Sequence, residues 1–322
     1  DRIGDFLMSA ILIKAIKRNN HQSHITVIAS DKNYFYIKTL DFIDEVYLYP
    51  NSFIKKIYFF FNLKRKNYDS IFALDGKKRS IYFSIFLKSK YKFLMTTKLI
   101  FKKLLNNFFS RIFLFNQSKN KISEILNVLE LLKMTLEEED IFYLKCQNIE
   151  SRNITKISDY LIFHFDEKWI FNDYINKYQS IEPTRSELVL FIKELAKKAD
   201  KNIVITTGIR INDLIKNLSS DFEKVGENLY EKKYNDKKVL LYKNINFFDL
   251  KYLIKNCSYI ITCHGAATHI ASAFNKKIYD IYDISQKDFY SKWNSHMKNY
   301  DFFYRENFKD LAQKILLKIL YF

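Results

Sequence analysis

Short apolar runs rich in β-branched and aromatic residues alternate with amphipathic stretches along nearly the whole chain. The runs that we expect to form strands are residues 24–29, 46–49, 70–75, 160–164, 202–207, 239–242, 259–262 and 277–282. Apolar residues at helical spacing lie between most of them. A regular succession of strand and helix is typical of βαβ units, in which helices cover a parallel sheet. The sequence therefore predicts an α/β fold.

The alternation falls into two series. A chain of 322 residues is longer than one average domain, since domains hold roughly 100 to 200 residues. We interpret the acidic run 137–140 as a solvated turn near the boundary, and we expect domains at 1–150 and 151–322. A helix at 306–321 is expected to close the second domain. Because ligands bind outside the carboxyl ends of the strands in such sheets, the loops after the strands are the first places to search for a site.

The composition excludes several classes of protein. Hydrophobic residues make up 48% of the chain, which excludes an intrinsically disordered protein. Cys146, Cys257 and Cys263 lack the spacing of a metal or redox motif, and the histidines show no metal-binding pattern, so we expect a reduced cytosolic protein without a bound metal. The sequence contains no run of 18 uncharged apolar residues, so no membrane span is predicted. The net charge of +17 indicates an anionic partner: nucleic acid, an acidic lipid surface or a phosphorylated sugar.

Residues 98–115 carry an amphipathic pattern and predict one long helix. Its apolar positions are rich in Phe and Leu, and Lys occupies the positions between them. Two interpretations stay open: the apolar face packs in the core, or it lies on a membrane surface.

The first motif is Gly4-Asp5, preceded by Arg2-Ile3, at the start of an apolar helical pattern. A glycine lets the backbone approach a ligand closely, and the next carboxylate then projects toward that ligand. An aspartate at a helix start is also a common cap.

The second motif runs from Tyr68 to Ser80, where a short strand is followed by Asp75, Gly76 and three cations. The local interpretation is a capped turn on a basic surface. The functional interpretation is that cations at a helix start bind an anionic acceptor such as a phosphorylated sugar. We assign acceptor contacts to Gly4, Asp75, Lys77, Lys78 and Arg79.

The third motif, residues 260–274, is a strand, a turn of small residues and an Ala-rich helix. The first-turn amides of such a helix can hold a diphosphate without a metal. The ends of two other strands offer further polar groups, although Thr206 and Thr207 also suit a strand and a helix cap. We assign donor contacts to His164, Lys168, Thr206, Thr207, Gly208, Arg210, His264, Gly265, Ala266, Ala267, Thr268 and His269.

These three motifs resemble those of glycosyltransferase family 9, the heptosyltransferase family of bacterial surface glycans. The family has a Gly-Asp pair after its first strand, a strand that starts with Tyr-Asp and ends before Arg-Ser, and a D-[SG]-G-x-x-H signature before an Ala-rich helix. Aligned on His269, this chain has His264 where the family usually has Asp, and Ala266 where it usually has Gly. The resemblance extends from residue 1 to about residue 320. Because the family's first strand precedes the Gly-Asp pair, we expect roughly ten residues before Asp1.

The resemblance implies an inverting, metal-independent glycosyltransferase of the GT-B type, with two Rossmann-like domains facing a cleft. Its donor would be a nucleoside-diphosphate sugar, with no further cofactor, and Asp5 would be the general base. The acceptor would be a lipid-linked or oligosaccharide part of lipopolysaccharide core, O-antigen or capsule. Such an enzyme is expected in the cytoplasm, peripheral to the anionic inner face of the membrane.

Two alternatives differ in class. The replacements at His264 and Ala266 are compatible with a binding or scaffold protein that has lost the chemistry. Nucleic-acid binding rests on the charge alone, because no recognised basic-aromatic module occurs, and we expect no nucleic-acid partner.

Overall fold

The computed structural model describes residues 3–96, 98–114, 120–150, 154–170, 176–208, 210–211 and 213–319. The chain divides into two compact units. The first unit runs to Ile141 and includes Ser291–His296, and the second holds Phe142–Tyr290 and the residues from Met297 onward.

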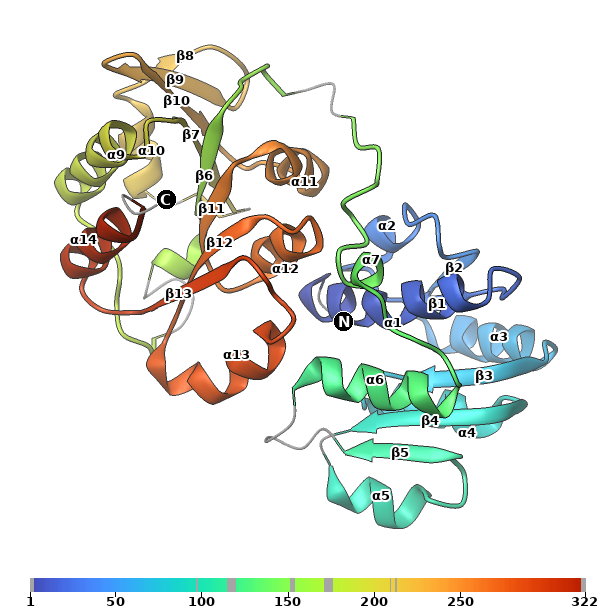
Figure 1. Cartoon of the computed structure of the whole chain (residues 1–322). Coiled ribbons are helices and arrows are strands. Elements are labelled where there is room, and N and C mark those ends of the chain that lie inside the picture. The colour runs from blue at the N-terminus through green and yellow to red at the C-terminus, as the bar shows by residue number, and fades with distance from the viewer. Residues whose placement is uncertain are drawn as a thin grey trace. The chain divides into compact units, whose positions relative to one another are not determined.

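The first unit alternates helices and short strands. Its elements are α1 (Ile3–Asn19), β1 (Thr26–Ala29), α2 (Tyr34–Ile37), β2 (Glu45–Leu48), α3 (Phe53–Lys64), β3 (Tyr68–Ala73), α4 (Lys78–Phe86), β4 (Ser89–Thr96), α5 (Leu99–Leu105), β5 (Arg111–Leu114), α6 (Lys121–Leu131) and α7 (Glu138–Ile141). The described strands form a parallel β1–β2 pair and a parallel β3–β4–β5 sheet. Helix α1 packs on α6 and α7, and α4 and α5 pack on β3 and β5 (Figure 1).

The predicted helix at 98–115 is wrong beyond Leu105. Residues Arg111–Leu114 form strand β5, which pairs in parallel with β4. The reason is that Asn106 and Asn107 interrupt the pattern, and the apolar run after them completes a sheet. The solvated turn at 137–140 is also wrong for Asp140, which is fully buried and accepts a hydrogen bond from Nε of Arg18 at 3.0 Å.

The second unit is built on one large sheet. Its elements are β6 (Tyr160–Phe165), η1 (Glu167–Trp169), α9 (Arg185–Ala199), β7 (Asn202–Thr207), α10 (Asp213–Ser219), β8 (Glu223–Lys224), β9 (Leu229–Tyr234), β10 (Lys237–Tyr242), α11 (Phe247–Asn256), β11 (Tyr259–Cys263), α12 (Ala266–Ala273), β12 (Lys277–Tyr282), η2 (Ile284–Gln286), α13 (Lys287–Asn294), β13 (Tyr300–Tyr304) and α14 (Phe308–Ile319). Helix α13 is shared, because its residues from Ser291 belong to the first unit.

The eight described strands of this sheet follow the order β13-β12-β11-β6-β7-β10-β9-β8. All are parallel from β13 to β10, and β9 and β8 extend the edge in antiparallel fashion. Figure 1 shows α9, α10 and α14 on one side of the sheet and α11 and α12 on the other. Parallel strands covered on both sides are mostly apolar, and every residue of β6 is accordingly buried, including His164 near its end.

The helices of the second unit begin and end at recognisable signals. Thr184 and Glu187 form a capping box at the start of α9, and Asp200 ends the helix in the left-handed conformation. Helix α14 packs against α9 and buries Leu311 and Ile315. None of the described helices is long and apolar enough to cross a membrane.

Candidate functional site

The order of the strands in the second unit reverses at β6. The chain runs from β6 to β7 on one side, and returns later to β11 on the other side. In open α/β sheets this switch point is where ligands bind, outside the carboxyl ends of the strands. The loops after β6, β7 and β11 contain the predicted donor residues, so the topology brings most of them to one edge of the sheet.

His164 is fixed at the end of β6 by its neighbours. Its Nδ1 lies 2.8 Å from the hydroxyl of Thr206, which is fully buried on β7. Its carbonyl oxygen accepts a hydrogen bond of 2.9 Å from the indole of Trp169, the centre of an aromatic cluster. The predicted residues His164 and Thr206 therefore contact each other directly.

The buried Asp166 forms an ion pair with the partly exposed Lys168 in the loop after β6. Burial tends to raise the pKa of the Asp166 carboxyl, but Lys168 and His164 outweigh it and hold that pKa well below its usual range. Burial tends to lower the pKa of the Lys168 ammonium, but Asp166 raises that pKa above its ordinary value. Both groups therefore stay ionised, and the loop places an ammonium and its carboxylate partner at the switch point.

The Lys168 ammonium lies beside the start of α12. A Cβ on Gly265 would stand only 2.9 Å from Nζ of Lys168, so the absence of a side chain at Gly265 lets the ammonium come this close. The Gly265 amide donates to the Thr268 hydroxyl at 3.2 Å, and Ala266 and Ala267 open the helix without bulky groups. A cation next to the first-turn amides and the positive end of a helix forms an anion-binding arrangement.

A buried carboxylate organises the other side of this turn. Asp280 on β12 is fully buried and accepts hydrogen bonds from His264 Nδ1 (2.6 Å), the Thr268 hydroxyl (3.0 Å) and the Tyr300 hydroxyl (2.9 Å). The His264 ring also contacts the rings of His269 and Tyr290. Hence the two histidines of the third motif lie side by side.

The loop after β7 contributes less. The Thr207 hydroxyl accepts from the amide of Asn244 at 2.8 Å, which is a structural role. A Cβ on Gly208 would stand 2.2 Å from Oε2 of Glu167, so the Gly208 backbone lies against that carboxylate. Arg210 is exposed beyond the strand.

In the first unit, Gly4 and Asp5 lie in the first turn of α1, and Asp5 is exposed; Arg2 lies outside the described residues. The charge of Asp5 acts on Lys121, whose ammonium stands 5.2 Å from the centre of the Trp293 ring. Burial lowers the pKa of Lys121, and Glu124 and Asp5 partly offset that effect.

The second motif forms the turn that leads into helix α4, which has no side-chain cap. The Asp75 carboxylate accepts from the Lys77 amide at 3.0 Å and from the Ser80 hydroxyl at 2.9 Å. Lys77 and Lys78 are exposed, and the Arg79 guanidinium lies over the Tyr49 ring at 5.1 Å. Gly76 has φ of +60°, a conformation that disfavours other residues.

Sequence reasoning missed several residues that shape these sites. They are Lys121, Asp166, Glu167, Asp280, Tyr300 and Arg305. Nη2 of Arg305 donates a hydrogen bond of 2.8 Å to the carbonyl oxygen of Lys168 and so holds that loop in place. One signal was available: an acid within the apolar strand Lys277–Tyr282 must have buried partners.

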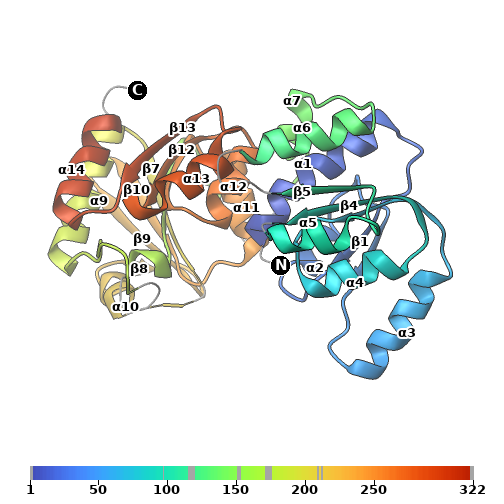
Figure 2. The same ribbon diagram turned by 90° about the horizontal axis from the view of Figure 1, so that it is seen from below.

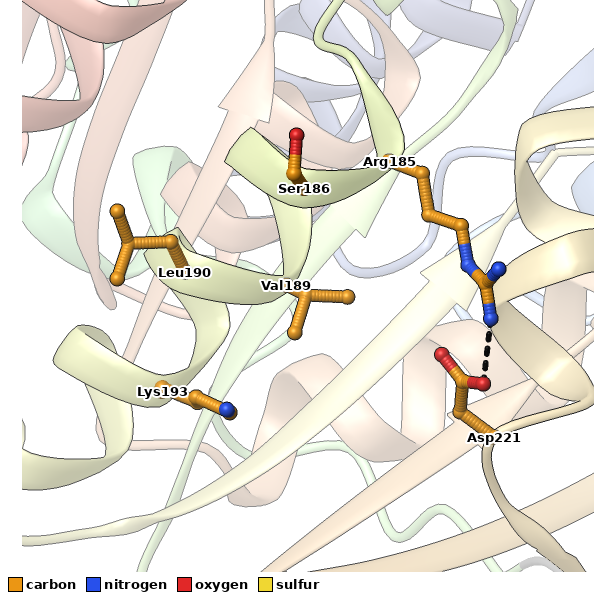
Figure 3. A pocket seen from close by; sticks show the side chains of 6 residues that line it. All are labelled: Arg185, Ser186, Val189, Leu190, Lys193 and Asp221. Carbon is orange, nitrogen blue, oxygen red and sulfur yellow. Dashed lines mark hydrogen bonds and ion pairs between the residues drawn. The ribbon is translucent and has the colours of Figure 1, made fainter.

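An open pocket of about 580 Å³ lies elsewhere in the second unit (Figure 3). It is lined by Arg185, Ser186, Val189, Leu190, Lys193 and Asp221. Figure 3 shows Arg185 pointing toward Asp221, with 2.5 Å between Nη2 and Oδ1. None of the predicted site residues lines this pocket, which is therefore separate from the switch point.

Comparison with solved structures identifies the fold. The chain is similar to E. coli heptosyltransferase WaaC with ADP, with a TM-score of 0.68 and 11% identity over 99% of this chain and 97% of that one. It is similar to a family 9 glycosyltransferase from Veillonella parvula, with a TM-score of 0.65 and 14% identity over 99% and 87%. It is also similar to E. coli ADP-heptose lps heptosyltransferase II, with a TM-score of 0.64 and 12% identity over 100% of this chain and 96% of that one.

No protein-family model matches the chain, and no curated protein matches it by sequence. The structural likeness covers nearly the whole chain in each case. The predicted α/β fold of the GT-B type is thus confirmed, and so is the resemblance in fold to the heptosyltransferases of family 9.

Proposed function

We propose that this protein is an inverting glycosyltransferase that moves a sugar from a nucleoside-diphosphate sugar to a bacterial surface glycan. The observation that supports it best is the Lys168 ammonium beside Gly265 at the start of α12, at the switch point of the sheet. In similar folds, E. coli WaaC was solved with ADP and with ADP-2-deoxy-2-fluoro heptose.

The second unit would bind the donor. The diphosphate accepts hydrogen bonds from the first amides of α12 and the Lys168 ammonium, and this charge takes the place of a divalent metal. His264 and His269 then lie next to the diphosphate, and His164 and Thr206 form the floor of the site.

The first unit would bind the acceptor. In the reaction, the acceptor hydroxyl oxygen attacks the anomeric carbon of the donor, and its proton goes to the Asp5 carboxylate. The bond from the anomeric carbon to the diphosphate oxygen breaks, and its electron pair leaves on the diphosphate. Lys77, Lys78 and Arg79 provide positive charge for an acidic or phosphorylated acceptor.

Isothermal titration calorimetry against ADP, UDP, GDP and CDP tests the donor half of the proposal. We expect one of them to bind, and Lys168→Met to weaken that binding about 10- to 100-fold, because a hydrogen bond to a charged group contributes roughly 1.5–3 kcal/mol. Lys193→Met, on α9, is the matched control and should bind like the wild type. Failure to bind any nucleotide would favour the scaffold alternative that the replacements at His264 and Ala266 motivate.

A further inference from the structure

The positive charge of the chain is concentrated in one part of the first unit. Residues 46–123 contain seventeen Lys and Arg, and their acidic residues are Asp69 and Asp75 alone. This segment therefore carries +15 of the net charge of +17. It comprises helices α3, α4 and α5 with the strands between them.

Helix α3 has two apolar faces. Its inner face packs on the unit, since Leu63 is buried and the Phe59 ring contacts Tyr47, Tyr49 and Phe83. Its outer face is a second stripe with helical spacing, which we term the α3 face. The α3 face consists of Phe53, Ile54, Ile57, Tyr58 and Phe61, which are 75%, 64%, 41%, 69% and 52% exposed.

The apolar surface continues from α3 onto α4. The Phe60 ring lies 5.9 Å from Phe61 and 6.4 Å from Phe86, and Phe86 is itself exposed. Lys55 and Lys64 stand exposed on α3, Arg65 stands exposed just after its end, and α3 carries no acid. Figure 2 shows α3, α4 and α5 on the side of β4 and β5 opposite to α6 and α7.

The chemistry of this surface selects one occupant. A second copy of the chain would bring two strongly positive faces together, which costs free energy. A nucleic acid would satisfy the cations and stack on rings, but it would leave Ile54 and Ile57 without an apolar partner. An anionic bilayer satisfies both, because headgroups pair with Lys and Arg while aromatic and aliphatic side chains enter the boundary with the acyl chains.

We propose that the α3 face inserts into the surface of an anionic lipid bilayer and anchors the protein there. The proposal deepens the proposed function and rests on it for its purpose, since a docked first unit meets lipid-linked acceptors. Binding to vesicles requires no glycosyl transfer, so the two proposals fail separately.

Co-sedimentation with vesicles tests the α3 face. We expect the wild type to bind phosphatidylglycerol–phosphatidylcholine vesicles and not pure phosphatidylcholine vesicles. The double variant Ile54→Ser/Tyr58→Ser should bind at least about tenfold more weakly, because two apolar side chains lose their burial. The control Leu190→Ser/Ile284→Ser removes two side chains that are 60% and 63% exposed in the second unit, and it should bind like the wild type.

Three results would overturn the proposal. The wild type could bind both vesicle types equally, or the Ile54→Ser/Tyr58→Ser variant could bind anionic vesicles as well as the wild type. The wild type could also bind duplex DNA, with the same variant losing DNA binding as well as vesicle binding. Circular dichroism checks that both double variants are folded. Calorimetry on the same proteins reads nucleotide binding independently. If the α3 variant loses vesicle binding but still binds nucleotide, the membrane proposal is supported independently of the transferase. If the wild type binds vesicles but no nucleotide, only the transferase proposal fails.

Discussion

Nδ1 of His264 lies 2.6 Å from Oδ2 of the fully buried Asp280. This contact fixes the His264 ring at the start of the third motif. The carboxylate comes from strand β12 and accepts the Nδ1 hydrogen, so that Nε2 is the other polar atom of the ring. Thr268 and Tyr300 complete the shell of donors that a buried carboxylate needs.

If Asp280 acts by orienting His264, the two residues should behave as one unit. We expect His264→Ala and Asp280→Asn each to weaken binding of a nucleoside-diphosphate sugar about tenfold, and the double variant to lose no more than His264→Ala. Calorimetry with the preferred nucleotide sugar measures all four proteins. Additive losses would mean that Asp280 does not act through His264.

A methyl group on Gly265 should disturb the donor site without removing any charge. The Gly265 φ of 173° is an extended conformation that alanine adopts freely, so the effect of Gly265→Ala comes from the 2.9 Å approach to the Lys168 ammonium. We expect nucleotide affinity to fall about tenfold as the ammonium is displaced. Gly226→Ala is the matched control in the same unit, where the new Cβ would meet Leu229 at 3.3 Å. If Gly265→Ala and Gly226→Ala bind nucleotide with equal affinity, Lys168 does not contact the nucleotide.

The sequence predicts five of the eight described strands of the large sheet, β6, β7, β10, β11 and β12, and misses β8, β9 and β13. The five have a physical reason. Strands that are buried on both sides, such as β6 and β7, are continuous apolar runs between polar ends. Strand β4 escaped prediction because its first half, Ser89–Lys92, is polar and half-exposed, and β5 was mistaken for helix because its apolar run is short.

The same limit applies to the site. The strand-end residues His164, Lys168 and Gly265 are visible in the sequence because a strand end and a helix start mark them. Asp280 comes from the neighbouring strand β12, and no local pattern records its contact with His264. Asp166 lies only two residues from Lys168, but an acid after a strand reads as an ordinary cap of the next turn.

Removal of the proposed general base should slow turnover strongly and spare the proposed donor site. We expect Asp5→Asn to lower activity about 100- to 10,000-fold, as is usual for a lost general base, while nucleotide affinity stays unchanged. Mass spectrometry of surface glycans from a deletion strain that expresses the variant measures the activity. Asp41→Asn, an exposed acid of the first unit, is the control. A wild-type glycan in the Asp5→Asn strain would exclude this role.

Glu45 should stabilise the first unit down to unusually low pH. Hydrogen bonds from Lys66 and Tyr47 lower the pKa of Glu45 from 4.5 to about 2. A carboxyl with a depressed pKa contributes stability that is fully present above pH 4.5 and is lost as the pH falls through about 2. Because the side chain is 29% exposed, the contribution is at most about 1 kcal/mol.

Urea unfolding of wild type and Glu45→Gln at pH 6, 4 and 3 measures this contribution. The wild type should keep most of its advantage at pH 4 and lose much of it at pH 3, because the loss begins below pH 4.5 and is complete only near pH 2. Glu130→Gln, an exposed acid on α6, controls for the loss of one negative charge and should match the wild type at each pH. An advantage that is already gone at pH 4 would contradict the depressed pKa and the Lys66 contact that causes it.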